Sequence, residues 1–215
     1  MELLERYQLA ALDLIFKART TQKEAVKKAG KIIADAVTQG HSIYLSGICH
    51  GIERDFYYRG GGVSFYQLYD KEKTELKPGD VLLVSSVSGR TESVVELAYN
   101  SMQIGVKVIA FTSMEYATVV EPIHSSGKKL YEFVTHVIDN CAPAAEAMLE
   151  VEGIEAKFAA ASGFASDFLL WSITAVAVEE MLRKGYKPGI YKSHNFSGGP
   201  EYNDEITKHF EEFGW

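Results

Sequence analysis

The chain has 215 residues, of which 47% are hydrophobic, enough for one good-sized core, so we predict a single domain over residues 1–215. Acidic residues outnumber basic ones, 29 to 22, and the formal net charge is -7. This balance argues against a nucleic-acid partner, whose phosphates require a basic surface, but it allows a small anionic ligand. The two cysteines, Cys49 and Cys141, exclude a disulfide framework and fit a reducing compartment.

The N-terminal residues do not resemble a signal peptide, because acidic residues occur early and no small-residue cleavage site follows. The most apolar run, residues 168–178, is much shorter than the roughly 20 residues of a membrane span. We therefore predict a cytoplasmic protein that has no membrane partner.

The spacing of apolar residues predicts helices and strands that alternate along most of the chain. Helices are predicted at about residues 3–16, 21–37, 91–101 and 162–184, with one or two helical turns at 53–59. Strands are predicted at residues 41–47, 63–69, 81–84, 106–111 and 134–138. Continuous apolar runs such as 81–84 are typical of strands buried on both faces.

This alternation predicts an α/β fold: a three-layer sandwich with a mostly parallel, doubly wound sheet flanked by helices. We expect N-terminal helices in residues 1–40, the α/β core in 41–185 and a polar, glycine-rich tail in 186–215. Ligands of such sheets bind beyond the carboxyl ends of the strands. Three loops should therefore lie together: 47–53, 85–91 and 112–113.

A serine-rich loop follows the buried strand at 81–84 and opens directly into a helix. Its polar residues and its glycine are Ser85, Ser86, Ser88, Gly89 and Thr91. Unpaired N–H groups at a helix start, together with short hydroxyl groups, can form a cup for a phosphate dianion, and Gly89 permits the tight turn. The alternative is an ordinary N-cap at Ser88 or Thr91. The loop is neither a Walker loop nor a GxGxxG fingerprint, so nucleotide binding is not indicated.

The segment 86–91, placed between a buried strand and an apolar helix, resembles the signature of the SIS (sugar isomerase) domain family. Residues 105–113 are similar to that family's next strand and loop. Further runs resemble a little-characterised subgroup described as SIS-domain proteins or phosphosugar isomerases: 124–131, 139–140 and 195–203. The resemblance covers roughly residues 20–205.

The loop positions and this resemblance together indicate the residues that would contact a sugar phosphate: Gly47, Ser85, Ser86, Ser88, Gly89, Thr91, Thr112, Ser113, His124 and Lys128. Two features depart from the family pattern. The first loop of the family usually resembles Gly-x-Gly followed by a hydroxyl residue, whereas this chain has Cys49 at the second glycine and Gly51 at the hydroxyl position. The stretch between residues 69 and 78 is also shorter than in the subgroup.

The resemblance implies isomerases that move a carbonyl between C1 and C2 of a sugar phosphate, ether lyases, or non-catalytic sensors of sugar phosphates. Isomerisation requires a base beside the carbonyl and a donor for the enediol oxygens. We predict three catalytic residues: Glu53 as the base, His50 as a ligand contact and His194 as a residue that reaches the active site of a neighbouring subunit. The alternatives are a solvated Glu53, a His50 paired with backbone and, for the loop from His124 to Lys128, a solvated basic turn. Glu146 and Glu201 are interpreted as surface charges.

No His, Cys or Asp cluster has the spacing of metal ligands, so neither a metal nor a cofactor is expected. Cys49 is interpreted as a small packing residue and not as a nucleophile. The favoured function is a cofactor-independent aldose–ketose isomerase acting on a sugar phosphate. The alternatives are a non-catalytic sensor and a lyase that cleaves an ether of an amino-sugar phosphate. The apolar helix at 162–184 and the N-terminal helix predict a homodimer or a homotetramer.

Overall fold

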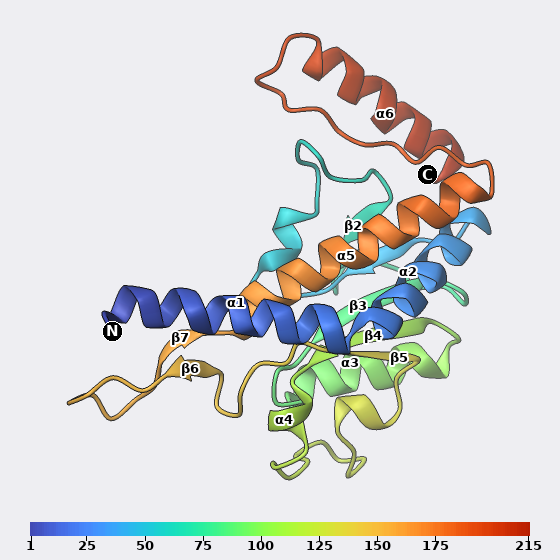
Figure 1. Ribbon diagram of the computed structural model, residues 1–215. Coiled ribbons are helices and arrows are strands. Elements are labelled where there is room, and N and C mark those ends of the chain that lie inside the picture. Colours follow the sequence, from blue (N-terminus) through green and yellow to red (C-terminus); the bar gives the residue numbers. More distant parts are fainter.

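The computed structural model describes residues 1–215 and contains a five-stranded sheet between two helical layers (Figure 1). The strands are β1 (Ile43–Leu45), β2 (Tyr66–Leu68), β3 (Val81–Ser85), β4 (Lys107–Thr112) and β5 (His136–Asp139). Their order in the sheet is β2-β1-β3-β4-β5, and all four pairings are parallel. Because β2 lies on one side of β1 and β3 on the other, the winding of the chain reverses between β1 and β3. This position is the topological switch point of the sheet.

Helices and short turns connect the strands. The helices are α1 (Leu3–Thr21), α2 (Lys23–Thr38), α3 (Glu92–Gln103), α4 (Met114–Ala117), α5 (Ser162–Arg183) and α6 (Gly199–Phe213). Two 3-10 turns are η1 (Ile52–Asp55) and η2 (Leu130–Glu132), and a small antiparallel hairpin joins β6 (Ala147–Leu149) to β7 (Phe158–Ala160). None of these helices combines the length and the apolar character needed to cross a membrane.

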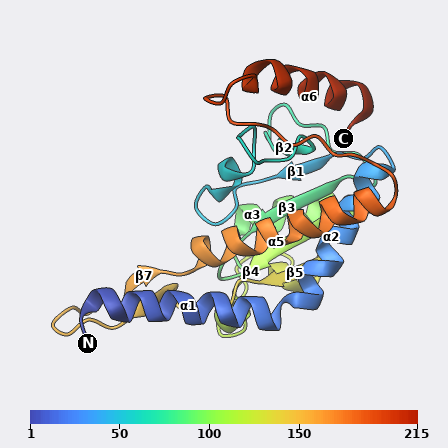
Figure 2. The ribbon, with the colours of Figure 1, turned by 45° about the horizontal axis from the view of Figure 1, so that its top comes forward.

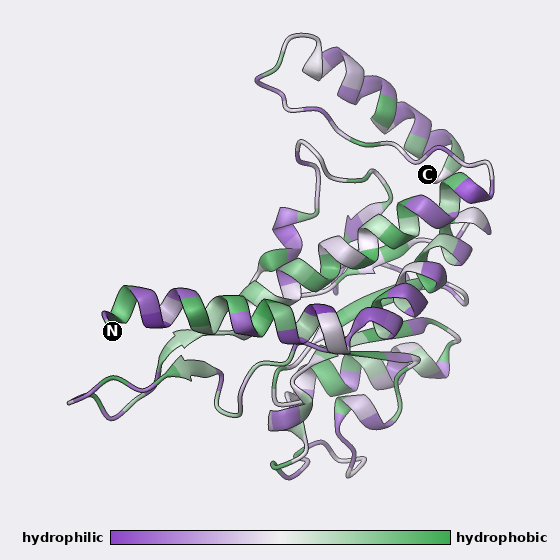
Figure 3. Ribbon diagram, viewed as in Figure 1, coloured by the Kyte–Doolittle hydropathy of each residue, from purple (hydrophilic) through white to green (hydrophobic).

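Alternating side chains of the strands form two apolar cores, one on each face of the sheet. Leu83, Ile109 and Phe111 are buried in the larger core with residues of α1, α2 and α5. Leu82 and Val84 point to the opposite face and pack in the smaller core with residues of α3. The central strands accordingly consist mainly of hydrophobic residues, as the colours of Figure 3 show. The predicted three-layer, doubly wound α/β fold is confirmed.

The predicted helices and strands are present, and the strands β1 and β2 are shorter than expected. Helix α6 was not expected within the polar tail. Figures 1 and 2 place it beside β2, past the end of α5. The buried Asn203 holds it, since its side chain accepts from Lys192 N at 2.8 Å and donates to Lys192 O at 2.9 Å. Tyr202, Ile206 and Phe210 recur every four residues along α6, which is a helical spacing, but the polar composition of the tail conceals it.

Helices α2 and α5 pack so closely that only glycine fits at one point of their contact. A Cβ atom at Gly30 would lie 2.5 Å from Val176 Cβ and 2.9 Å from Ile173 O. Gly30 is therefore the residue that sets the spacing of these two helices over the sheet.

We expect the substitution Gly30→Ala to lower the free energy of unfolding by about 1–2 kcal/mol, because overpacking outweighs the gain in helix propensity. Urea unfolding would measure the change. The exposed neighbour offers a control, and Lys31→Ala should have little effect. Adding Val176→Ala to Gly30→Ala should recover part of the loss. Equal stability of wild type and Gly30→Ala would contradict the proposed close contact.

Candidate functional site

A cavity of about 390 Å³ lies at the carboxyl ends of β1 and β3, at the switch point of the sheet. Ten residues from four segments of the chain line it: Gly47, Cys49, His50, Ser85, Ser86, Val87, Ser88, Thr91, Tyr116 and Glu146. The loops after β1 and β3 form two of its walls. As expected from the parallel sheet, two of the three predicted loops therefore meet at one site.

The loop after β3 presents backbone N–H groups that have no acceptor in the protein. These are the N–H groups of Val87, Ser88, Arg90, Glu92 and Ser93. Helix α3 begins here, so the positive end of its dipole adds to these donors. Thr91 occupies the N-cap position, but its side chain makes no capping hydrogen bond. An N-cap serving the helix alone therefore does not account for the loop.

Internal hydrogen bonds hold this loop in shape while leaving its donors free. Ser86 Oγ accepts from Thr91 N at 3.2 Å and lies 2.9 Å from Thr91 Oγ1. Gly89, at φ 68°, donates to Ser86 O, and a Cβ there would lie 3.0 Å from Ala117 Cβ. The hydroxyl of Ser88 has no partner in the protein and lines the cavity. The arrangement can bind an anion with little reorganisation.

The loop after β1 forms the opposite wall with an unusual run of backbone conformations. Gly47, Cys49 and His50 have φ values of 34°, 35° and 66°, in the region that favours glycine. Their N–H groups also have no acceptor in the protein. Glu53 stabilises the loop, because its Oε2 accepts from Ile48 N at 2.9 Å. Successive N–H groups in such a turn form a second concave donor surface.

Cys49 is buried at the base of the cavity in a network of small polar groups. Its Sγ lies 2.9 Å from Ser85 Oγ and 3.0 Å from Ser166 Oγ, and Asn140 Nδ2 lies 3.4 Å from Ser166 Oγ. Burial raises the pKa of the Cys49 thiol, and hydrogen bonds from the two serines offset only part of this effect. The thiol is neutral at physiological pH, which fits a packing and hydrogen-bonding role.

Glu146 supplies the carboxylate of the cavity. Its Oε1 accepts from Ser162 N at 3.2 Å and also from Ser162 Oγ, at the first residue of α5. Its Oε2 has no partner in the protein. Glu146 itself adopts φ 81°. One oxygen is thus held by a helix start, while the other is available to a ligand.

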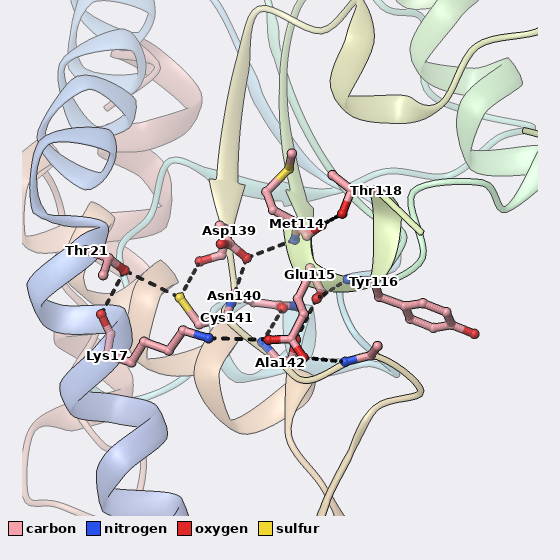
Figure 4. Close-up of polar contacts among 12 residues, drawn as sticks. Lys17, Thr21, Met114, Glu115, Tyr116, Thr118, Asp139, Asn140, Cys141 and Ala142 are labelled. Atoms are coloured by element: carbon pink, nitrogen blue, oxygen red, sulfur yellow. Dashed lines mark hydrogen bonds and ion pairs between the residues drawn. The ribbon is translucent and has the colours of Figure 1, made fainter. Parts of the chain in front are cut away.

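Polar contacts at the end of β5 position the wall that carries Tyr116 and Glu146 (Figure 4). Asp139 Oδ1 accepts from Met114 N at 3.0 Å and from Cys141 N at 2.9 Å. Glu115 accepts from Ala144 N at 3.2 Å and lies 3.6 Å from Lys17 Nζ on α1. These contacts connect α1, α4 and the loop that leads to Glu146.

The other residues predicted for the site lie outside the cavity lining. Thr112 and Ser113 are fully buried and support it, since Thr112 Oγ1 donates to Val87 O at 3.2 Å and Ser113 Oγ donates to Ala142 O at 2.6 Å. Glu53 contacts the loop backbone and does not line the cavity. His194 is exposed and lies beside Tyr58, with ring centroids 5.6 Å apart.

The 124–128 loop also lies outside the lining. The buried His124 Nε2 lies 2.5 Å from Glu96 Oε2, and its Nδ1 lies 2.8 Å from Ser126 Oγ. The hydrogen bond from His124 lowers the pKa of Glu96. Lys128 is exposed, whereas the buried Lys129 donates to Ala117 O and Val120 O. This loop therefore braces α3 and α4 within the chain.

Four lining residues were not among the predicted site residues: Cys49 and Val87, which belong to the two predicted loops, and Tyr116 and Glu146, which lie outside them. Glu146 was interpreted as a surface charge, and Tyr116 was not considered. Tyr116 belongs to the short helix α4 directly after β4, so its place after a strand was a usable signal. Glu146 follows β5 by several residues, and only the folded loop brings it to the cavity. No group of His, Cys, Asp and Glu in the structure is arranged to hold a metal ion.

The sequence matches known proteins over nearly its whole length. A family model described as "SIS domain" matches residues 65–113. A UPF0309 protein of Listeria monocytogenes is 32% identical over 219 residues, covering 93% of this chain and 94% of that protein. A UPF0309 protein of Shouchella clausii is 30% identical over 237 residues, covering 97% and 96%.

Solved structures with the same fold share little sequence identity. Phosphoheptose isomerase of Neisseria gonorrhoeae has a TM-score of 0.56 at 13% identity, over 83% of this chain and 98% of that chain. A Methanococcus jannaschii protein, described as suggesting a 3-hexulose-6-phosphate isomerase, has a TM-score of 0.52 at 19% identity, over 97% of both. The NanR protein of Vibrio vulnificus, complexed with ManNAc-6P, has a TM-score of 0.53 at 15% identity, over 98% of this chain and 68% of that one.

We expect Gly89→Ala to destabilise the protein by more than Gly127→Ala. Both glycines have nearly the same positive φ, 68° and 67°. The backbone strain of an alanine should therefore lower the free energy of unfolding by a similar amount, about 1 kcal/mol, at either position. Only at Gly89 would the new Cβ also touch Ala117 and Thr112, whereas Gly127 has open space. Thermal unfolding of both variants would measure the difference. Equal losses would show that the serine-rich loop is not tightly packed.

Proposed function

This chain belongs to the UPF0309 family and contains a SIS domain, and from this premise we propose that it binds a sugar phosphate in the cavity between the loops after β1 and β3. The observation that carries the proposal is the set of backbone N–H groups between Val87 and Ser93 that have no acceptor in the protein. Val87, Ser88 and Arg90 are half-buried, whereas Glu92 and Ser93 are exposed. Half-buried donors without acceptors are costly, and a phosphate at a helix start would satisfy several at once.

The other lining residues support the binding of a sugar, with its several hydroxyl groups, attached to that phosphate. No Lys or Arg lines the cavity, so a single anionic group is favoured over a polyphosphate. Glu146, His50 and Tyr116 offer acceptors and donors suited to hydroxyl groups. Solved structures with this fold include a phosphoheptose isomerase and a regulator complexed with ManNAc-6P, which supports the same ligand class.

We propose aldose–ketose isomerisation as the reaction. Glu146 Oε2 takes the proton from C2 while His50 gives a proton to the carbonyl oxygen at C1, and the enediol forms. Glu146 then returns its proton to C1 while the C2 hydroxyl gives its proton back to His50, which leaves the carbonyl at C2. Ser162 holds the other carboxylate oxygen and so orients this base. His50 and the unpaired N–H groups of the first loop donate to the enediol oxygens. We thus propose Glu146 as the base in place of Glu53, because the Glu53 carboxylate accepts a hydrogen bond from the backbone of the loop after β1.

A non-catalytic sensor is the second candidate, because the fold is shared with the NanR protein complexed with ManNAc-6P. A sensor would use the same N–H groups, and it would bind the ligand without moving a proton. Exposed apolar side chains on α1, among them Leu4, Leu12 and Phe16 at 61%, 67% and 64% exposure, support a homodimer for either function.

Sugar phosphates should raise the melting temperature, whereas the matching unphosphorylated sugars should not, because ligand binding stabilises the folded state. The substitution Ser88→Ala should weaken binding by about tenfold, since it removes a hydroxyl donor to a charged group. The exposed Ser93 lies in the first turn of α3, and its side chain is outside the lining, so Ser93→Ala, which keeps the backbone N–H, should retain affinity. Thermal shift and calorimetry would measure both. Stabilisation by both sugar forms alike would contradict phosphate binding at this cavity.

Exchange of the C2 proton of a bound sugar phosphate with solvent should occur in wild type and be lost in Glu146→Gln. The amide retains the size of the carboxylate but is not a base, so binding should persist while NMR shows no exchange. The substitution Glu53→Gln should lower exchange less, because that side chain positions the loop. Binding without exchange in wild type would favour the sensor. Full exchange in Glu146→Gln would eliminate Glu146 as the base.

A further inference from the structure

A second cavity, of about 330 Å³, lies between helix α6 and the outer strand β2. Five aromatic side chains contribute to its lining: Tyr57, Tyr58, Tyr66, Tyr191 and Phe210. It shares no lining residue with the cavity at the switch point. This second cavity lies apart from the residues assigned to the proposed isomerase or sensor function, so that function does not account for it.

The aromatic rings of this cavity pack against one another, and one of them, that of Tyr58, belongs to a residue with a strained backbone conformation. The ring centroids of Tyr58 and Tyr191 lie 4.9 Å apart in an edge-to-face arrangement, and those of Tyr57 and Tyr58 lie 6.4 Å apart. Tyr58 adopts φ 46°, a value that bulky side chains rarely accept. Tyr57 and Tyr58 nevertheless remain 45% exposed. Two tyrosine rings are thus presented to the cavity and to solvent.

A buried polar group in the lining has no partner. Ser64 is 3% exposed, and its Oγ forms no hydrogen bond in the structure. Its position is tightly defined, since a Cβ at Gly189 would come within 2.8 Å of this oxygen. Buried hydroxyl groups are normally hydrogen-bonded, so an unsatisfied one that lines a cavity points to a ligand group.

The charge of the lining is negative. Apart from the tyrosines, Glu211 on α6 is the one ionisable residue that lines the cavity. No Lys or Arg forms an ion pair with it. Two cations of the adjacent segments are engaged elsewhere: Arg59 pairs with Asp55 at 2.6 Å, and Lys192 Nζ lies 4.1 Å from the Tyr202 ring centre. Lys208, three residues before Glu211 on α6, is exposed and forms no ion pair with it. The cavity therefore combines aromatic rings, an unpaired carboxylate and an unsatisfied hydroxyl group.

We propose that this second cavity binds a small organic ammonium ion that carries a hydroxyl group. The faces of the tyrosine rings attract a cation, and Glu211 supplies the opposite charge. The hydroxyl group of the ligand hydrogen-bonds with Ser64 Oγ after rotation of the Ser64 side chain, because this oxygen has almost no accessible surface in the structure. A neutral molecule of the same shape would gain the packing but neither electrostatic contribution.

Choline and its uncharged isostere 3,3-dimethyl-1-butanol are the probes that separate charge from shape. We expect saturable choline binding by calorimetry, with the isostere at least tenfold weaker because it lacks the cation–π and carboxylate contributions. Equal affinities, or the absence of saturable choline binding to wild type, would overturn the proposal.

Matched variants locate the site. Glu211→Gln should weaken choline binding by about tenfold. Glu212→Gln, which makes the same change of charge at an exposed neighbour outside the lining, should leave it unchanged. Both positions are exposed, and equal melting temperatures would verify that the variants fold. Equal weakening by both substitutions would show a nonspecific charge effect and reject the cavity as the site.

Discussion

The candidate site depends on backbone N–H groups that the fold leaves without acceptors where β1 and β3 end. The chain leaves β1, adds β2 on one side of it and then returns to build β3 on the other, so that no strand connection fills the gap between the two carboxyl ends. Helix α3 starts directly in this gap and cannot satisfy its own first N–H groups. The topology of the sheet and the geometry of a helix start therefore create the same feature, a set of unpaired donors beside one cavity.

Strained backbone conformations occur at both cavities. Cys49, His50 and Glu146 line the first cavity and Tyr58 lines the second, and all four have positive φ values. Such conformations cost about 1–3 kcal/mol each and persist only where the surroundings enforce them. Around the first cavity the enforcing contacts are identifiable: Glu53 holds the loop of Cys49 and His50, and Ser162 holds Glu146. The strain places N–H groups and a carboxylate where an unstrained chain would turn them away.

The sequence predicted the sheet, its flanking helices and the serine-rich loop because each has a local signal. Buried parallel strands appear as apolar runs, and a hydroxyl-rich turn between a strand and a helix marks an anion site. Glu146 had no such signal, because it reaches the cavity through a loop held by Asp139, Asn140 and Glu115. The same limit applies to His124, whose pairing with Glu96 spans 28 positions of the chain. Contacts between distant segments decide which polar residues face the cavity, and local patterns do not contain them.

The replacement of a glycine-like position by Cys49 has a consequence for the chemistry. In the structure the thiol does not block the cavity, since it turns inward and joins Ser85, Ser166 and Asn140. One group of short side chains thereby connects the loop after β1, the end of β3, the loop after β5 and helix α5. Because burial keeps the Cys49 thiol neutral, this thiol adds no charge at the base of the cavity. Glu146 is the one carboxylate among the residues that line the cavity. A site with amide donors on two walls and a single oriented carboxylate on the third separates phosphate binding from proton transfer.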